Sequence, residues 1–380
     1  MVTSTRATAT TRRRTRTATI DCDIHNAFPS EAALLPHLPE RWSLFLERFG
    51  LQSYGYGGAS YPRASPNAAR ADAWPPNGKP PGSDLPFLRE QLLDKWDIQV
   101  GILNPLIAGA AQPNVEYGAA IATAINDWQV AEWLEPEPRL RASIVVPYED
   151  GELAVAEIDR RASDPRFVQV LLLARTAEPL GRRKYWKLYE AAERHNLPVG
   201  IHFGGTCGHA ITGSGWPYFY LEDHVGMPQS FQAQLASFVF EGVLERFPAL
   251  KVVVIEGGLA WLAPLLWRMD RAWEGMRAEV PHVSRRPSEL IREHVWLTTQ
   301  PMEEPEKQGQ FLQMLEHLDM NHHLMFATDY PHWDFDAPDQ AFPERLPEEL
   351  EQQVLSANAT RLYRLSTTSQ DDAAPFGLVK

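Results

Sequence analysis

Two residues with the chemistry of metal ligands end a short apolar stretch near the start of the chain. Asp23 and His25 close the stretch 18–26, and their spacing of two places both side chains on one face of a strand. A carboxylate and an imidazole at a strand end can bind one side of a divalent metal ion. A single Asp-x-His triplet is common by chance, so it carries weight only if later strands end in further ligands.

Later apolar stretches do end in such residues. The further candidates are His202 in 198–203, Glu256 at the end of 251–256 and Asp329 at the end of 324–329. Two imidazoles and two or three carboxylates around one centre suit a divalent cation with an open water position. Buried charges of this kind would be costly without a cation, so a metal site explains the set better than packing does.

The elements that would position these residues alternate along the chain. Strands are expected over 18–26, 97–105, 140–147, 167–173, 198–203, 251–256, 295–298 and 324–329, and helices over 117–134, 151–162, 183–195, 230–246, 259–273, 306–318 and 348–363. Strands that are apolar on both faces indicate a parallel sheet, and eight β/α units indicate a (β/α)8 TIM barrel with its site at the C-terminal strand ends. An open doubly wound sheet is the alternative, but the chain lacks the glycine-rich phosphate loop that it would need after its first strand.

The barrel is expected to occupy residues 18–365. Residues 1–17 form a basic arm, and residues 366–380 form a flexible polar tail. Between residues 30 and 93 we expect an insertion after the first strand, with a helix over 31–49 and then loops rich in proline, glycine and aromatic residues. So long an irregular segment inside a compact domain is usually functional or disordered, and its aromatic residues favour a lid over the site.

Composition narrows the classes of partner. The chain has 380 residues, of which 44% are hydrophobic and 22% charged, as in a globular protein, and it contains no apolar run that could span a membrane. A net charge of −13 argues against nucleic acid, so the expected partner is a small-molecule substrate. Only two cysteines are present, which fits a reducing, cytoplasmic location.

The arginine-rich N-terminus resembles a transit peptide in composition, but it lacks the apolar segment of a secretory signal. It is either a disordered tail or an arm that becomes ordered against another subunit. The second reading predicts a homo- or hetero-oligomer with the arm at an interface.

Several motifs together carry a family resemblance. They are Asp21-Cys22-Asp23-Ile24-His25, Gly200-Ile201-His202-Phe203-Gly204, Gly226-Met227-Pro228, Phe247-Pro248-Ala249-Leu250-Lys251, Glu256-Gly257-Gly258, Thr328-Asp329-Tyr330-Pro331-His332 and Asn358-Ala359-Thr360-Arg361-Leu362-Tyr363. Over about residues 18–365 the chain resembles the amidohydrolase superfamily. The similarity is to the branch that includes aminocarboxymuconate semialdehyde decarboxylase and the resorcylate-type decarboxylases.

The resemblance implies a set of metal ligands. It places His25, His202 and Asp329 on the metal, and it places Asp23 where many members have histidine and some have an acid, so Asp23 is expected to ligate as well. The extra acid shifts the preference from Zn²⁺ towards Mn²⁺ or Fe²⁺. The lysine that bridges two metals in binuclear members is missing from 167–173. One metal ion is therefore expected, with a second as an open alternative.

Two residues have several open roles. Glu256 stands where the branch commonly has a histidine, and it could be a general base, a ligand of a second metal, or a structural acid bonded to backbone N–H groups. His224 could be a proton shuttle, a second-metal ligand, or a loop histidine held by Asp223.

Other residues are expected near the substrate. His332 and Trp333 closely follow Asp329 and should face the pocket mouth. Arg175, at the end of the fourth strand, either pairs with a substrate carboxylate or is a solvated charge. Cys22 points away from the ligand face and Cys207 has no evident base partner, so a cysteine nucleophile is not expected.

The expected function is metal-dependent hydrolysis or non-oxidative decarboxylation of a small substrate that bears a carboxylate or an amide. Protons would be moved by Glu256, His224 or Asp329 near a metal-bound water or substrate. Two alternatives remain open from the sequence: an oxygen-activating Fe or Mn hydroxylase of the same superfamily, and a metal-stabilised partner subunit of such an enzyme.

Overall fold

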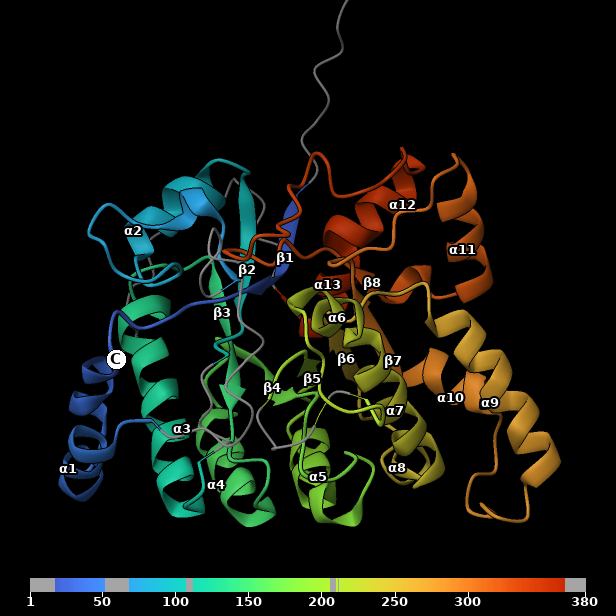
Figure 1. The fold of residues 1–380 in the computed structure, drawn as a ribbon, viewed down its shortest axis with the longest axis horizontal. Helices are drawn as coiled ribbons and strands as arrows, with labels where there is room; N and C mark the ends of the chain where they lie inside the picture. Colours follow the sequence, from blue (N-terminus) through green and yellow to red (C-terminus); the bar gives the residue numbers. More distant parts are fainter. Residues whose placement is uncertain (1–17, 52–67, 107–111, 206–209, 211, 366–380) are drawn as a thin grey trace, which may run out of the picture.

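The computed structural model describes residues 18–51, 68–106, 112–205, 210 and 212–365, and its centre is a ring of parallel strands (Figure 1). The strands are β1 (Thr19–Ile24), β2 (Ile98–Leu103), β3 (Leu140–Val145), β4 (Phe167–Leu173), β5 (Val199–His202), β6 (Val252–Ile255), β7 (Val295–Thr298) and β8 (Leu324–Met325), and they follow one another around the sheet in chain order. Backbone bonds join the last strand region to the first, since Cys22 N–H donates to Phe326 O at 3.0 Å. The chain is therefore the predicted (β/α)8 TIM barrel.

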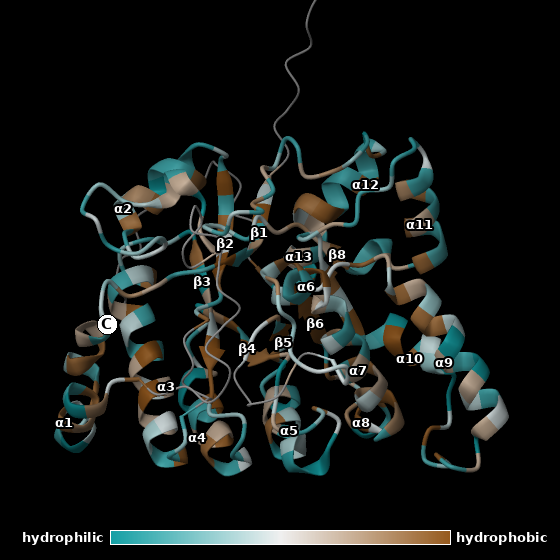
Figure 2. Cartoon of the chain, in the orientation of Figure 1, coloured by the Kyte–Doolittle hydropathy of each residue, from teal (hydrophilic) through white to brown (hydrophobic). Residues whose placement is uncertain are grey.

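Burial on both faces explains why these segments are strands. All seven residues of β4 are buried, and so are all four of β7. In Figure 2 the strands are mostly apolar, whereas the helices carry both apolar and polar residues. A parallel sheet covered by helices requires this pattern, and the predicted bounds 167–173 and 295–298 agree with β4 and β7.

Helices connect the strands and cover the barrel. They are α1 (Glu40–Phe49), α2 (Leu85–Leu88), α3 (Val115–Gln129), α4 (Gly151–Arg161), α5 (Trp186–Arg194), α6 (Tyr220–Val225), α7 (Met227–Phe240), α8 (Val243–Arg246), α9 (Leu262–Met276), α10 (Pro287–His294), α11 (Gln310–Leu318), α12 (Glu348–Gln352) and α13 (Asn358–Tyr363). Side-chain caps begin some of them: the Asp150 carboxylate accepts from the N–H groups of Glu152 and Leu153 at the start of α4.

Several predicted elements were wrong in their extent. The predicted helix 230–246 is two helices, α7 and α8, because Gly242 adopts a φ of 84° between them. The predicted helix 31–49 is a 3₁₀ segment (Glu31–His37) followed by α1, with Pro39 at the N-cap of α1. The predicted strand 324–329 ends after Met325. The short helices α6 and α10 were not predicted at all.

The segment between β1 and β2 packs beside α3. Its helix α1 places Trp42 against Tyr117 of α3, with ring centroids 5.4 Å apart. The aromatic loop at 54–58, the basic arm 1–17, the tail 366–380 and Cys207 all lie outside the described residues, so the predictions for them remain predictions. Among the residues that the structure describes, no helix is long and apolar enough to cross a membrane.

Candidate metal centre

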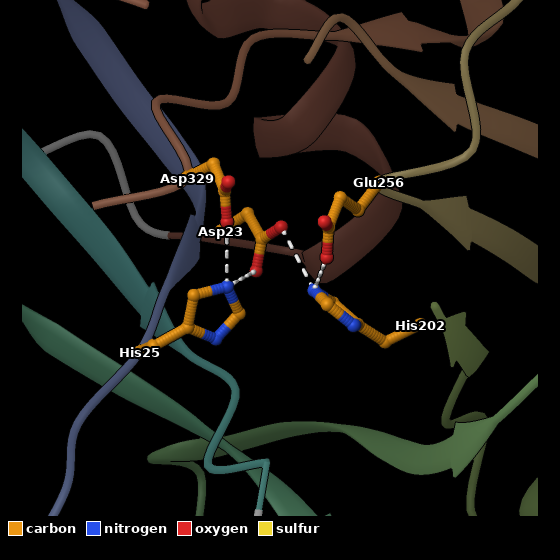
Figure 3. A group of neighbouring side chains, drawn as sticks. All are labelled: Asp23, His25, His202, Glu256 and Asp329. Carbon is orange, nitrogen blue, oxygen red and sulfur yellow. Dashed lines mark hydrogen bonds and ion pairs between the residues drawn. The ribbon is translucent and has the colours of Figure 1, made fainter. Parts of the chain in front are cut away.

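Five buried side chains converge at the C-terminal ends of the strands. Each offers one nitrogen or oxygen atom, and these atoms all lie within 4.8 Å of one another (Figure 3): Asp23 from β1, His25 just after β1, His202 from β5, Glu256 just after β6 and Asp329 in the segment after β8. The set contains the four residues predicted as ligands and Glu256, one of the two predicted as optional ligands.

The backbone turns sharply at two of these positions. Glu256 has a φ of 56° and Asp329 a φ of 60°, a left-handed conformation that side chains other than glycine rarely adopt. This backbone conformation costs about 1–3 kcal/mol of folding free energy for each such residue, and residues that adopt it are found most often at functional sites.

The two histidines present the same ring nitrogen to the centre. His25 Nδ1 lies 2.8 Å from the backbone oxygen of Asn104, and His202 Nδ1 lies 2.6 Å from the backbone oxygen of Phe203. Because a carbonyl oxygen only accepts, both Nδ1 atoms carry the hydrogen. In the neutral rings this leaves each Nε2 with a lone pair directed at the centre, an arrangement that metal-binding histidines commonly show.

Those lone pairs face carboxylate oxygens. His25 Nε2 lies 2.7 Å from Asp329 Oδ1, and His202 Nε2 lies 3.2 Å from Asp23 Oδ2 and 3.0 Å from Glu256 Oε2. Asp329 Oδ2 is buried and has no hydrogen-bond partner among the described residues. A divalent cation would satisfy the lone pairs, the orphaned oxygen and the excess negative charge together, so the residues present fit a metal ion.

The electrostatics of the cluster favour positive charge at its centre. Burial opposes a charged His202, yet the Asp23 and Glu256 carboxylates outweigh it and raise the pKa of this histidine well above its usual value. Burial, and then the charge of Asp329, raise the pKa of Glu256. Three carboxylates against two histidines leave an excess of negative charge in this buried cluster, which a divalent cation would neutralise.

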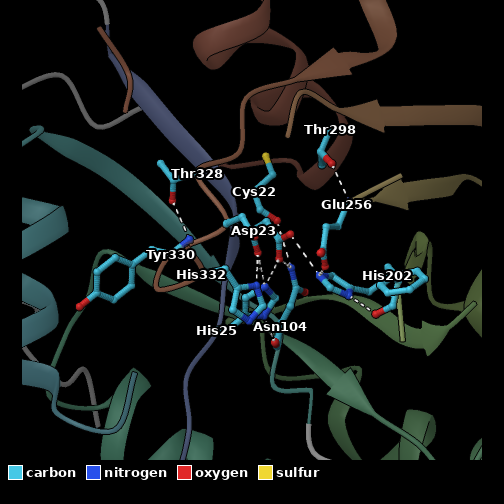
Figure 4. A network of polar contacts seen from close by, with 12 residues as sticks. Cys22, Asp23, His25, Asn104, His202, Glu256, Thr298, Thr328, Tyr330 and His332 are labelled. Atoms are coloured by element: carbon cyan, nitrogen blue, oxygen red, sulfur yellow. Dashed lines mark hydrogen bonds and ion pairs between the residues drawn. The ribbon is translucent and has the colours of Figure 1, made fainter. Parts of the chain in front are cut away.

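A polar layer below the centre was missed from the sequence. Asn104 Nδ2 donates to Asp23 Oδ1 at 2.8 Å (Figure 4). Asn104 Oδ1 accepts from Ser143 Oγ at 2.5 Å and from Gln169 Nε2 at 3.1 Å. Tyr363 of α13 closes the layer by donating to Gln169 Oε1 at 2.9 Å. The layer orients Asp23, as outer-shell partners orient metal ligands. Its only sequence signal is polar residues inside otherwise apolar strands.

Asp21 was also missed. It is fully buried, and its carboxylate accepts from the backbone N–H of Thr328 at 3.0 Å and from the Thr328 hydroxyl at 2.6 Å. Burial raises the pKa of Asp21 to about 7, although the bonds from Thr328 oppose the shift. By holding Thr328, Asp21 fixes the backbone immediately before Asp329.

His332, which was predicted to face the pocket mouth, lies beside the cluster. Its Nδ1 donates to Asp329 Oδ1 at 2.7 Å, and its ring stacks on His25 with centroids 4.4 Å apart (Figure 4 includes both). Burial lowers its pKa, but the Asp329 carboxylate outweighs burial and raises the pKa to about 9. His332 is thus a protonatable group in direct contact with a ligand.

His224 does not join the five-residue cluster. Its Nε2 lies 3.0 Å from Asp334 Oδ2, and its ring packs against Trp333 with centroids 5.2 Å apart. The predicted partner Asp223 instead accepts from Arg175 at 2.6 Å. Adjacent residues on a helix point about 100° apart, so Asp223 and His224 meet different neighbours.

The fold and the cluster together define a (β/α)8 enzyme of the metal-dependent type. A family model described as amidohydrolase matches residues 20–365, and the chain belongs to that family. Gamma-resorcylate decarboxylase from Polaromonas sp. (strain JS666 / ATCC BAA-500) is 24% identical over 321 residues, which cover 75% of this chain and 92% of that relative.

Solved structures show the same fold. An amidohydrolase from Mycobacterium avium subsp. paratuberculosis K-10 superposes with a TM-score of 0.67 at 20% identity, over 91% of this chain and 99% of that one. A dihydroxybenzoic acid decarboxylase from Polaromonas sp. JS666, with bound manganese and the inhibitor 2-nitroresorcinol, gives a TM-score of 0.63 at 18% identity, over 92% and 97% of the two chains.

Proposed function

We propose that this enzyme removes CO₂ from a hydroxylated aromatic acid without oxidation, using one divalent metal ion, with Mn²⁺ preferred. The observation that carries the proposal is the buried cluster of two histidines and three carboxylates, whose ligand atoms lie within 4.8 Å of one another. The decarboxylases among the relatives and structural neighbours support carboxy-lyase chemistry over oxygen activation.

The residues around the centre would bind the metal ion and orient its ligands. When bound, the metal ion would supply a Lewis acid that anchors the carboxylate and the neighbouring hydroxyl of the substrate. Asp23, His25, His202 and Asp329 would hold that ion, and Asn104 orients Asp23. The five residues of the cluster are 0–7% exposed, so their side chains are shielded from bulk water.

Asp329 and His332 can move the proton that the reaction needs. Burial would raise the pKa of Asp329, but the charge of His332 and the bonds from His25 and His332 outweigh it and lower this pKa, so the proton rests on His332. The bond between the ring carbon and the carboxylate breaks, and its electron pair stays on the ring carbon. As CO₂ leaves, His332 passes its proton through the 2.7 Å hydrogen bond to Asp329, which delivers it to that carbon, and His332, whose side chain is 14% exposed, takes a new proton from water.

Hydrolysis is the second candidate, because Glu256 lies at the centre in reach of His202, where a general base for a water molecule would stand. The deciding experiment incubates the Mn²⁺-loaded protein with 2,6-dihydroxybenzoate under nitrogen and measures CO₂ and resorcinol. Equal amounts of both products, lost in His202→Ala, are expected. No CO₂ from hydroxybenzoates at any pH, together with cleavage of amide or ester substrates, would assign hydrolysis instead.

A further inference from the structure

Helix α6 is tied to two opposite sides of the barrel. Its Asp223 accepts a hydrogen bond from Arg175, which follows β4, at 2.6 Å. Its Tyr220 hydroxyl accepts from Trp333 Nε1, in the segment after β8, at 2.8 Å. Because the eight strands are arranged in chain order, β4 and β8 lie across the barrel from each other. Helix α6 therefore bridges the mouth above the metal centre.

This helix buries none of its own residues, although a surface helix normally packs an apolar face on the core. Large apolar side chains in and around it are exposed instead. They form what we call the apolar rim: Tyr218 (87% exposed), Phe219 (64%), Leu221 (66%), Val225 (76%) and Trp333 (40%). Clustered exposed apolar residues mark a surface that binds something apolar.

One residue of the apolar rim, Trp333, lies beside the metal centre. Trp333 directly follows His332, which is bonded to Asp329, and Trp333 packs on His224 with ring centroids 5.2 Å apart. His224 Nε2 lies 3.0 Å from Asp334 Oδ2, so the loop after Asp329 and helix α6 are held together beside the centre. A ligand that extends outward from the metal would thus meet the rim next.

We propose that the apolar rim binds a hydrophobic substituent on the ring of the substrate, so that the substrate class is hydroxybenzoic acids carrying an alkyl chain. This inference rests on the proposed function, because it assumes that the acid group lies at the metal centre. A monocyclic acid with only polar substituents would leave the rim in water. A chain on the far side of the ring from the carboxylate would cover it.

The test measures binding, so that it does not depend on turnover. Mn²⁺-loaded protein is titrated calorimetrically with resorcinols bearing unbranched 5-alkyl chains of increasing length. Each methylene that the rim removes from water should lower Kd about fourfold. Trp333→Ala and Phe219→Ser should flatten this dependence while the melting temperature stays close to wild type. Trp267→Ala is the matched control, because Trp267 is 54% exposed on α9, outside the rim.

The outcomes separate the two proposals. A Kd that is independent of chain length, or a chain-length dependence that survives Trp333→Ala and Phe219→Ser, would overturn the inference. A concentration-dependent dimer that dissociates in Phe219→Ser, with the chain-length dependence unchanged, would assign the rim to a second copy of the chain and also overturn it. If longer alkyl chains strengthen binding but the dihydroxybenzoic acids with the same chains release no CO₂, the result supports binding at the apolar rim and contradicts the proposed decarboxylation.

Discussion

Replacing Asn104 tests whether the polar layer below the centre acts on the metal. Asn104 is fully buried, and its Nδ2 donates to Asp23 Oδ1 and to the backbone oxygen of Cys22. Asn104→Ala leaves both acceptors unbonded, whereas Ser143 and Gln169 keep the 2.9 Å bond between them. At about 1–3 kcal/mol for each stranded acceptor, the free energy of unfolding should fall by about 2–6 kcal/mol. Affinity for Mn²⁺ should fall about 10- to 100-fold, because Asp23 loses its orienting partner.

Asn126 provides a matched control for this experiment. It is also fully buried, with its Nδ2 donating to Val145 O at 2.8 Å and to Glu157 Oε1 at 2.6 Å, and it has no contact with the five ligands among the bonds that the structure describes. Both variants should lose stability in urea denaturation, but only Asn104→Ala should lose Mn²⁺ affinity in a chelator competition. Equal Mn²⁺ affinity in Asn104→Ala and Asn126→Ala would refute the reasoning.

Three further predictions concern His332, the bound metal ion and the ion pairs of Glu137. His332→Gln should lower kcat for decarboxylation about a hundredfold or more with little change in KM, and an unchanged kcat would remove His332 from the proton path. Mn²⁺ at about 100 times its Kd should raise the free energy of unfolding by about 2.7 kcal/mol, and a similar rise in His202→Ala would place the metal elsewhere. Burial opposes a charged Glu137, yet Arg139 and Arg89 outweigh it and lower its pKa from 4.5 to about 2. Its stabilisation of about 3 kcal/mol is therefore present above pH 4.5 and lost as pH falls towards 2. The stability gap between wild type and Glu137→Gln should narrow in urea denaturation below pH 4.5, and a gap independent of pH would contradict this account.

The sequence was sufficient to predict the barrel and to select the residues that cluster at its mouth, because both are strongly patterned. A parallel strand is buried on both faces, so β4 and β7 appear as continuous apolar runs. A metal ligand in such a barrel stands at a C-terminal strand end, where a polar residue after an apolar run is conspicuous. His202 and Glu256 could be found in this way, and the structure places both in the cluster.

Features that depend on tertiary contacts could not be predicted. Asn104 lies near the end of the expected strand 97–105 with no sign of its partners in the sequence, and only the pairing of β2 with β1 and β3 brings its amide to Asp23 and Ser143. Helix α6 has no apolar face directed at the core, so hydrophobic spacing gave no signal for it. The left-handed turn at Asp329 has no sequence signature either, because aspartate is found in many conformations.

The most direct test of the central claim is an anomalous diffraction map of Mn²⁺-loaded crystals at the manganese edge. The account predicts one strong peak surrounded by the five side chains Asp23, His25, His202, Glu256 and Asp329, and the loss of that peak in His202→Ala. A peak between His224 and Asp334 with none in the five-residue cluster would contradict it. So would a map without manganese in the cluster from protein that decarboxylates hydroxybenzoates.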